Sequence, residues 1–105
     1  MYLGSYTSEG RKGIVAEGGS KRREAVEALA RSVGGKLVHF SFAIGEHDIV
    51  AIVDVPDTAA ALVAPLLVGS LGVANITTVP LLDPSTLDDV AARIKKATYR
   101  APGAN

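Results

Sequence analysis

Apolar and polar residues alternate with a helical period between residues 20 and 33. Four apolar residues there are spaced i, i+3, i+4 and i+7, so they share one face of a helix. They are Val26, Leu29, Ala30 and Val33. Ser20 is suited to cap the start of this helix, and Gly34 can end it because glycine adopts the left-handed backbone of a C-cap. The pattern predicts a helix that covers a core.

Two later stretches are also predicted to be helices. Residues 57–72 are apolar nearly all round, which indicates burial on more than one side, and Pro65 should kink or split this helix. Residues 83–96 form the other helix. Asp57 and Asp83 are the expected N-caps of the two helices. The apolar stripe of the second one consists of Leu87, Val90, Ala91 and Ile94.

Stretches rich in β-branched and aromatic residues predict strands at residues 2–7, 36–44, 48–55 and 75–81. Only three residues separate the second strand from the third, which predicts a hairpin. A pairing of Ile44 with Asp48 puts one set of side chains on the same face of the sheet, namely Val38, Phe40, Phe42, Val50 and Ile52. A slip of one residue would move one strand's side chains to the other face, so the facing stays open.

Residues 8–19 contain four glycines and are predicted to be an irregular connector, with one helical turn at residues 14–16. The order of elements is then β-α-β-β-α-β-α. This order predicts an α+β fold, a ferredoxin-like βαββαβ arrangement with an added C-terminal helix, in which helices cover one face of an antiparallel sheet. We expect one domain over residues 1–98 and a tail over residues 99–105.

Charge sums to zero but is unevenly distributed. Residues 1–36 hold seven bases and four acids, residues 37–92 hold seven acids and no base, and residues 93–105 hold four bases. This segregation suits subunits or faces that attract each other, and a solvated surface on which the charges mix is the alternative. The second sheet face carries few charges and no predicted helix. We therefore expect self-association, as a dimer or larger homo-oligomer.

The composition of the 105 residues narrows the function classes. The absence of cysteine excludes a disulfide scaffold, thiolate metal sites and a cysteine nucleophile. A net charge of zero does not fit a general nucleic-acid binder. The longest apolar run, residues 59–74, is interrupted and is shorter than the roughly 20 residues that span a bilayer. We expect a cytoplasmic protein with no membrane segment, metal or cofactor.

The stretch GGKLVHFSFAIGEHDIVAIVDVPD, from Gly34 to Asp57, resembles the core of the GYD-domain proteins. Gly45 and Asp48 occupy the positions of the glycine and aspartate for which that family is named, and His47 stands where tyrosine is usual. The earlier GSYTSEG and the later PLLDPS also fit, so the resemblance covers nearly the whole chain. It implies a fold similar to the dimeric α/β-barrel superfamily, and it does not imply an activity.

Polar residues on the predicted strands suggest a ligand pocket. His39 and Ser41 lie two apart and share a strand face, where Tyr2 or Tyr6 would complete a half-polar pocket. In the alternative, His39 and Ser41 satisfy each other or a neighbouring subunit. The pair has no orienting acid, so the sequence favours no hydrolase.

The hairpin sequence Glu46-His47-Asp48 is the densest polar cluster of the chain. A histidine beside carboxylates can act as a general base or as a metal ligand. Consecutive strand residues point to opposite faces, however, and one histidine with one carboxylate makes a poor metal site. The alternative is a structural role, in which Asp48 accepts backbone donors within the turn.

Bases surround the glycine-rich connector and form a candidate anion patch, which consists of Arg11, Lys12, Lys21, Arg22 and Arg23. A helix N-terminus with bases nearby can bind a phosphate or carboxylate. A solvated basic surface is the alternative.

A small-molecule-binding or regulatory module is the function that these patterns favour. Its small apolar or anionic ligand would contact Tyr6, His39, Ser41, His47 and Asp48. One alternative is a cofactor-independent enzyme of the dimeric α/β-barrel type, an oxygenase or isomerase, for which no catalytic residue can be named. The other alternative is a purely structural interaction domain. A cavity that contains these polar residues would favour binding or catalysis over the structural role.

Overall fold

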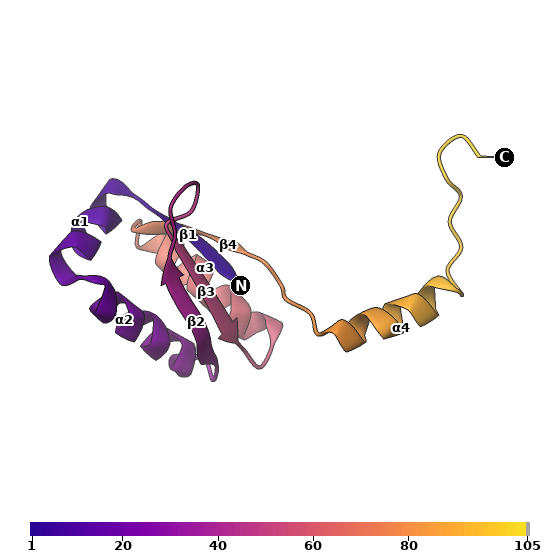
Figure 1. The fold of residues 1–105 in the computed structure, drawn as a ribbon, viewed down its shortest axis with the longest axis horizontal. Coiled ribbons are helices and arrows are strands. Elements are labelled where there is room, and N and C mark those ends of the chain that lie inside the picture. Colours follow the sequence, from indigo (N-terminus) through magenta and orange to yellow (C-terminus); the bar gives the residue numbers. More distant parts are fainter. Residues whose placement is uncertain (105) are drawn as a thin grey trace.

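The computed structural model describes residues 1–104. Its elements are β1 (Tyr2–Tyr6), α1 (Ser8–Glu17), α2 (Gly19–Ser32), β2 (Lys36–Phe42), β3 (Ile49–Asp54), α3 (Thr58–Ser70), β4 (Ala74–Thr78) and α4 (Pro84–Ile94). The strands form one antiparallel sheet in the order β2-β3-β1-β4 (Figure 1). This is the predicted α+β, ferredoxin-like arrangement with an added C-terminal helix, and one further helix precedes α2.

That further helix, α1, occupies the stretch predicted to be a connector with one helical turn at residues 14–16, so the predicted turn lies within a longer helix and the irregular remainder is wrong. Thr7 caps α1 by accepting a hydrogen bond of 3.2 Å from the amide of Gly10. The glycines of α1 lower its helix propensity, so the sequence pattern does not indicate the whole of this helix. Gly10 is buried, and a Cβ there would overlap the carbonyl oxygen of Val73. Because it has no side chain, Gly10 allows α1 to lie this close to the residue that precedes β4.

The pairing of β2 with β3 differs by one residue from the predicted register. Phe42 lies opposite Ile49 rather than opposite Val50. The cause is the connection between the strands, because the amide of Ala43 donates to the carbonyl of Asp48 at 2.8 Å and leaves four loop residues instead of three. Both phenylalanines of β2 consequently share the helix-covered face with Ile49.

A β-bulge in β2 brings one more side chain to that face. The pairing jumps from Leu37 to His39, so Val38 lies opposite no residue of β3. Such an extra residue changes which face of the sheet the side chains on one side of the bulge point to. Leu37 is therefore buried in the core, whereas Val38 is 60% exposed.

The core lies between one face of the sheet and the helices α2 and α3. Its most buried side chains are Tyr2, Ala30, Leu37 and Ala51. Partly buried residues packed against them are Val26, Phe40, Val53, Ala64 and Ile76. These residues come from all four strands and both helices, so the core holds the whole ferredoxin-like body together.

A hydrogen bond from β1 compensates for a proline inside α3. Pro65 has no N–H, so the carbonyl of Ala61, four residues earlier, lacks its helical donor. The hydroxyl of Tyr2 donates to that carbonyl oxygen at 2.6 Å. The helix therefore continues through Pro65, and the orphaned carbonyl joins α3 to the sheet.

The opposite face of the sheet carries no helix among the described residues. The strand registers place one set of side chains there, namely Leu3, Ser5, His39, Ser41, Val50, Ile52, Asn75 and Thr77. The registers place two further side chains on this face, the charged residues Lys36 and Asp54, which lie opposite each other where β2 begins and β3 ends. We call this side of the sheet the open face.

Beyond β4, the chain leaves the body and forms α4, which projects from one end of the molecule (Figure 1). The described residues extend over 61 × 32 × 24 Å as a result. Asp83 caps α4 by accepting a hydrogen bond of 2.9 Å from the amide of Ser85, as predicted. Within residues 1–104, none of the helices has the length and apolar character that a membrane crossing requires.

Candidate functional site

Tyr6 ends β1, and two hollows border its side chain on the helix-covered face of the sheet. The first hollow has a volume of about 190 Å³, and its lining includes Tyr6, Ile14, Glu17 and Arg22. The second has a volume of about 290 Å³, and its lining includes Tyr6, Arg11, Ile14, Phe42 and Asp48. Because Tyr6 and Ile14 border both, we call the two hollows together the Tyr6 pocket.

Two residues that line the first hollow each have a buried polar atom without a hydrogen-bond partner among residues 1–104. These atoms are the hydroxyl of Tyr6 and Nε of Arg22. Arg22 Nε forms an ion pair of 2.8 Å with Oε1 of Glu17, and it makes no hydrogen bond to a described residue. Buried polar groups without a partner are uncommon, because each has lost its hydrogen bonds to water. Tyr6 and Arg22 therefore each retain an unsatisfied donor beside this hollow.

The electrostatic surroundings of Tyr6 keep its phenol protonated. Burial raises the pKa of Tyr6 above its ordinary value of 10.0, Arg22 partly opposes this, and the carboxylates of Asp48 and Glu17 raise the pKa further. A neutral phenol donates one hydrogen bond and is a poor base near neutral pH. Tyr6 is therefore suited to bind an acceptor rather than to remove a proton.

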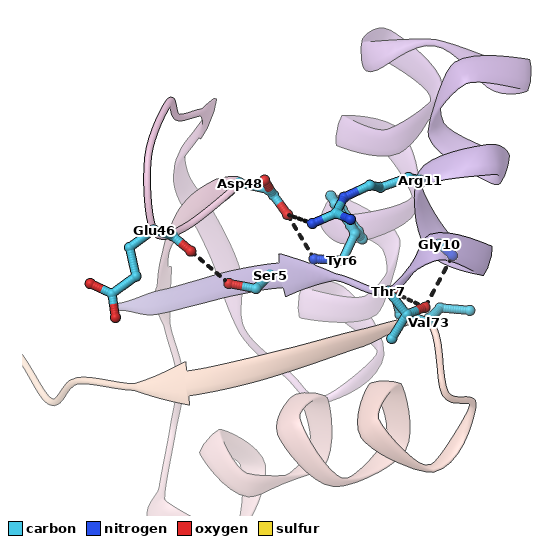
Figure 2. Close-up of polar contacts among 8 residues, drawn as sticks. All are labelled: Ser5, Tyr6, Thr7, Gly10, Arg11, Glu46, Asp48 and Val73. Carbon is cyan, nitrogen blue, oxygen red and sulfur yellow. Dashed lines mark hydrogen bonds and ion pairs between the residues drawn. The ribbon is translucent and has the colours of Figure 1, made fainter.

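In the second hollow, an arginine and an aspartate face each other beside Tyr6. The carboxylate of Asp48 accepts a hydrogen bond of 2.8 Å from the backbone amide of Tyr6. Figure 2 shows the side chain of Arg11 extending from α1 toward the same carboxylate, with 4.0 Å between Arg11 Nη2 and Asp48 Oδ2. The Arg11 side chain is 63% exposed, so the pair is loose and Arg11 can turn toward a ligand.

Asp48 holds the hairpin loop against β1. Its amide donates to the carbonyl of Gly4 at 2.8 Å, in addition to the contact between its carboxylate and Tyr6. Ser5 strengthens this junction, since its hydroxyl donates to the carbonyl of Glu46 at 3.1 Å (Figure 2). The donor to Asp48 lies in β1 and not within the turn, contrary to the expectation from the sequence. Gly45 has φ +123°, a conformation that glycine alone adopts readily.

The structure does not bring all the predicted ligand residues together. His39 and Ser41 lie on the open face, 3.1 Å apart from Nε2 to Oγ, whereas Tyr2 and Tyr6 point to the helix-covered face. The expected half-polar pocket of His39 and Ser41 with a tyrosine of the first strand is therefore wrong. His47 is half-buried in the hairpin loop, and its Nδ1 is buried without a partner among residues 1–104.

The predicted anion patch is divided between the two hollows and the solvent. Arg11 borders the second hollow and Arg22 the first. Lys12, Lys21 and Arg23 are exposed. The patch as a whole is therefore not one site, and two of its members enter the Tyr6 pocket from α1 and α2.

Sequence reasoning named Arg11 but missed two other residues that α1 contributes to the pocket. Ile14 and Glu17 line the first hollow, but they lay in a stretch predicted to be a connector. Two signals for the helix were present, a threonine cap at Thr7 and an acidic first turn at Glu9. Across residues 1–104, no group of three or more His, Cys, Asp or Glu side chains is arranged to hold a metal ion.

Comparison with known proteins gives one informative result. Neither the curated proteins nor the solved structures contain a match to this chain. The family model of the GYD domain matches residues 1–91, which include every residue named in the Tyr6 pocket. The chain therefore belongs to the GYD-domain family.

Proposed function

We propose that the protein is a small-molecule-binding module and that its ligand occupies the Tyr6 pocket. The observation that carries this proposal is the pair of unused donors beside the first hollow, the Tyr6 hydroxyl and Arg22 Nε. A ligand with an acceptor group would satisfy whichever of these donors it reaches. A hydrogen bond from a charged donor contributes about 1.5–3 kcal/mol, enough to select an occupant with an acceptor.

The size of the hollows limits the ligand to a small molecule. Pockets for drug-sized ligands measure about 300–1,000 Å³, and the two hollows measure about 190 and 290 Å³. A nucleotide or a large cofactor exceeds either hollow. Ile14 borders both, and Phe42 adds apolar surface to the second. The ligand is therefore a small molecule with an apolar part and an acceptor group.

The charges around the pocket favour a monoanionic carboxylate over a phosphate. Arg11 and Arg22 are its bases, while Glu9, Glu17 and Asp48 are its acids. The acids outnumber the bases by one, so they would repel a doubly charged phosphate more strongly than a singly charged carboxylate. A carboxylate carries one charge and can accept from either Tyr6 or Arg22.

Self-association through the open face is a second part of the proposal. Leu3, Val50 and Ile52 form an apolar strip there. The charged residues Lys36 and Asp54 lie opposite each other at one end of this face, beyond the strip. A second copy would bury this strip without burying an unpaired charge. The face is opposite to the Tyr6 pocket, so assembly leaves the pocket accessible.

The experiment is a thermal-shift assay with three compounds. Two of them have nearly the same shape but differ in charge, and the third is an anion without an apolar part. Benzoate, its neutral amide benzamide and inorganic phosphate are added to the purified protein at equal concentrations. Benzoate should raise the melting temperature most, because only benzoate combines an apolar ring with a carboxylate. Replacement Arg22→Gln should reduce the benzoate shift, whereas Arg23→Gln, at the neighbouring exposed residue, should retain it. Equal shifts for benzoate and benzamide would contradict a carboxylate ligand.

A further inference from the structure

The apolar stripe of α4 has no partner within the described chain. Leu87 is 68% exposed, Ile94 is 66% exposed and Val90 is 39% exposed. The helix has 11 residues, and helices shorter than about 12–15 residues are marginal in water without tertiary contacts. An amphipathic helix of this length on an arm is stabilised when its stripe docks on another surface.

A groove of matching character lies where the arm leaves the body. Its volume is about 550 Å³, with room for several side chains. Apolar residues from β3, α3 and the arm line it, among them Val53, Val55, Leu62 and Val79. Leu62 is 49% exposed, so the groove is open to a partner.

The charges of the groove and of the arm are complementary. Asp54 and Asp57 are exposed carboxylates that line the groove, and its lining contains no Lys or Arg. The terminal amino group of Met1 also lies there and donates to the carbonyl of Val79 at 2.6 Å. The end of α4 and the segment after it carry four bases, namely Arg93, Lys95, Lys96 and Arg100. A basic helix end thus suits an acidic groove.

The first part of the arm lies in the groove, and α4 follows it without contacting the groove. Two hydrogen bonds between Met1 and Val79, of 2.6 and 2.7 Å, fasten the start of the arm to β1. Pro80 and Leu81 then line the groove themselves. Only two residues separate Leu81 from Pro84, the first residue of α4, and two residues span at most about 7 Å. Across this short connection α4 extends away from the body instead of folding back on it (Figure 1).

From these observations we propose that α4 of one copy docks in the acidic groove of a second copy. A two-fold axis makes the exchange reciprocal, so both stripes and both grooves are covered. This interface is separate from the Tyr6 pocket, and it borders the open face at Ile52, which also lines the groove. It assigns α4 a function in assembly.

The chain contains no cysteine, which permits a direct test by disulfide formation. Two full-length variants, Leu62→Cys and Leu87→Cys, are prepared separately, mixed and oxidised. Non-reducing gel electrophoresis should show linked dimers at least tenfold above the level of either variant alone. The matched control is Ala92→Cys on the opposite face of α4, which should give no such increase with Leu62→Cys.

Two results would overturn the proposal. One is the absence of linked dimers in the mixture of Leu62→Cys with Leu87→Cys above the control with Ala92→Cys. The other comes from a double variant with both cysteines in one chain, if oxidation yields only internally linked monomers. That result would place α4 on its own body. Neither result depends on ligand binding, so failure here is distinguishable from failure of the proposed function.

Discussion

The backbone amide of Tyr6 donates a hydrogen bond of 2.8 Å to the carboxylate of Asp48, 42 residues later in the sequence. This contact joins the end of β1 to the β2–β3 hairpin and forms one wall of the second hollow. The motif aspartate of the family is therefore a residue that holds the pocket together.

Replacement Asp48→Ala should lower the free energy of unfolding by about 1–3 kcal/mol, because the amide of Tyr6 loses its acceptor in a half-buried position. Urea denaturation measures the change. The control is Glu46→Ala, since Glu46 contributes its backbone carbonyl to Ser5 and its side chain makes no ion pair within residues 1–104. Equal effects of the two substitutions would contradict the role assigned to the Asp48 carboxylate.

The contact between Tyr2 and α3 predicts a specific coupling. Tyr2→Phe should cost about 1–3 kcal/mol of stability, because the carbonyl of Ala61 loses its donor. In a Pro65→Ala background, the new amide at position 65 can donate to Ala61, so Tyr2→Phe should cost less than half as much. A double-mutant cycle in urea measures the difference. A cost that is independent of residue 65 would show that the proline does not create the need for the tyrosine.

Two glycines of α1 should respond in opposite directions to alanine. Gly10→Ala should destabilise the protein by at least about 1–3 kcal/mol, because the added methyl group overlaps the carbonyl of Val73 and forces α1 away from β4. At Gly13 an added Cβ meets no atom within 4 Å, so Gly13→Ala should stabilise α1 by about 0.5–1 kcal/mol. Thermal denaturation of both variants tests the packing of α1, and a stabilising Gly10→Ala would contradict it.

Stability should fall under alkaline conditions. Burial raises the pKa of both Tyr2 and Tyr6 above 10.0, so the folded state retains protons that the unfolded state releases first. The two tyrosines therefore contribute to the free energy of unfolding. This contribution is fully present below pH 10 and is lost as the pH rises through their pKa values in the folded state. Urea denaturation at pH 8 and pH 11 measures the loss. The variant with both Tyr2→Phe and Tyr6→Phe should lose less stability over this interval than the unaltered chain, and an equal loss would contradict the assignment.

Much of the fold could be predicted because single segments encode it. Some features of the helices depend only on residues that are close in the sequence. They are the apolar stripe of Val26, Leu29 and Ala30 and the caps at Asp57 and Asp83. These local signals were sufficient for the ferredoxin-like order of elements.

The rest required contacts between distant segments. Most of α1 was missed because Gly10 lowers helix propensity while serving a contact with Val73, which no local pattern reveals. The bulge at Val38 and the four-residue loop decide which face His39 occupies, and the sequence left that choice open. The pocket itself combines β1, α1, α2 and the hairpin, so only Tyr6, two of the bases and Asp48 could be named beforehand.

The most direct test of the proposed binding site is calorimetric titration of benzoate into three proteins, the unaltered chain, Tyr6→Phe and Tyr2→Phe. Tyr6→Phe removes the unused donor, whereas Tyr2→Phe removes a hydroxyl that lies outside both hollows. Benzoate should bind the unaltered chain and Tyr2→Phe with similar Kd values, and it should bind Tyr6→Phe roughly tenfold more weakly. Equal affinity of Tyr6→Phe and the unaltered chain, or no binding to any of the three, would contradict the proposed binding site.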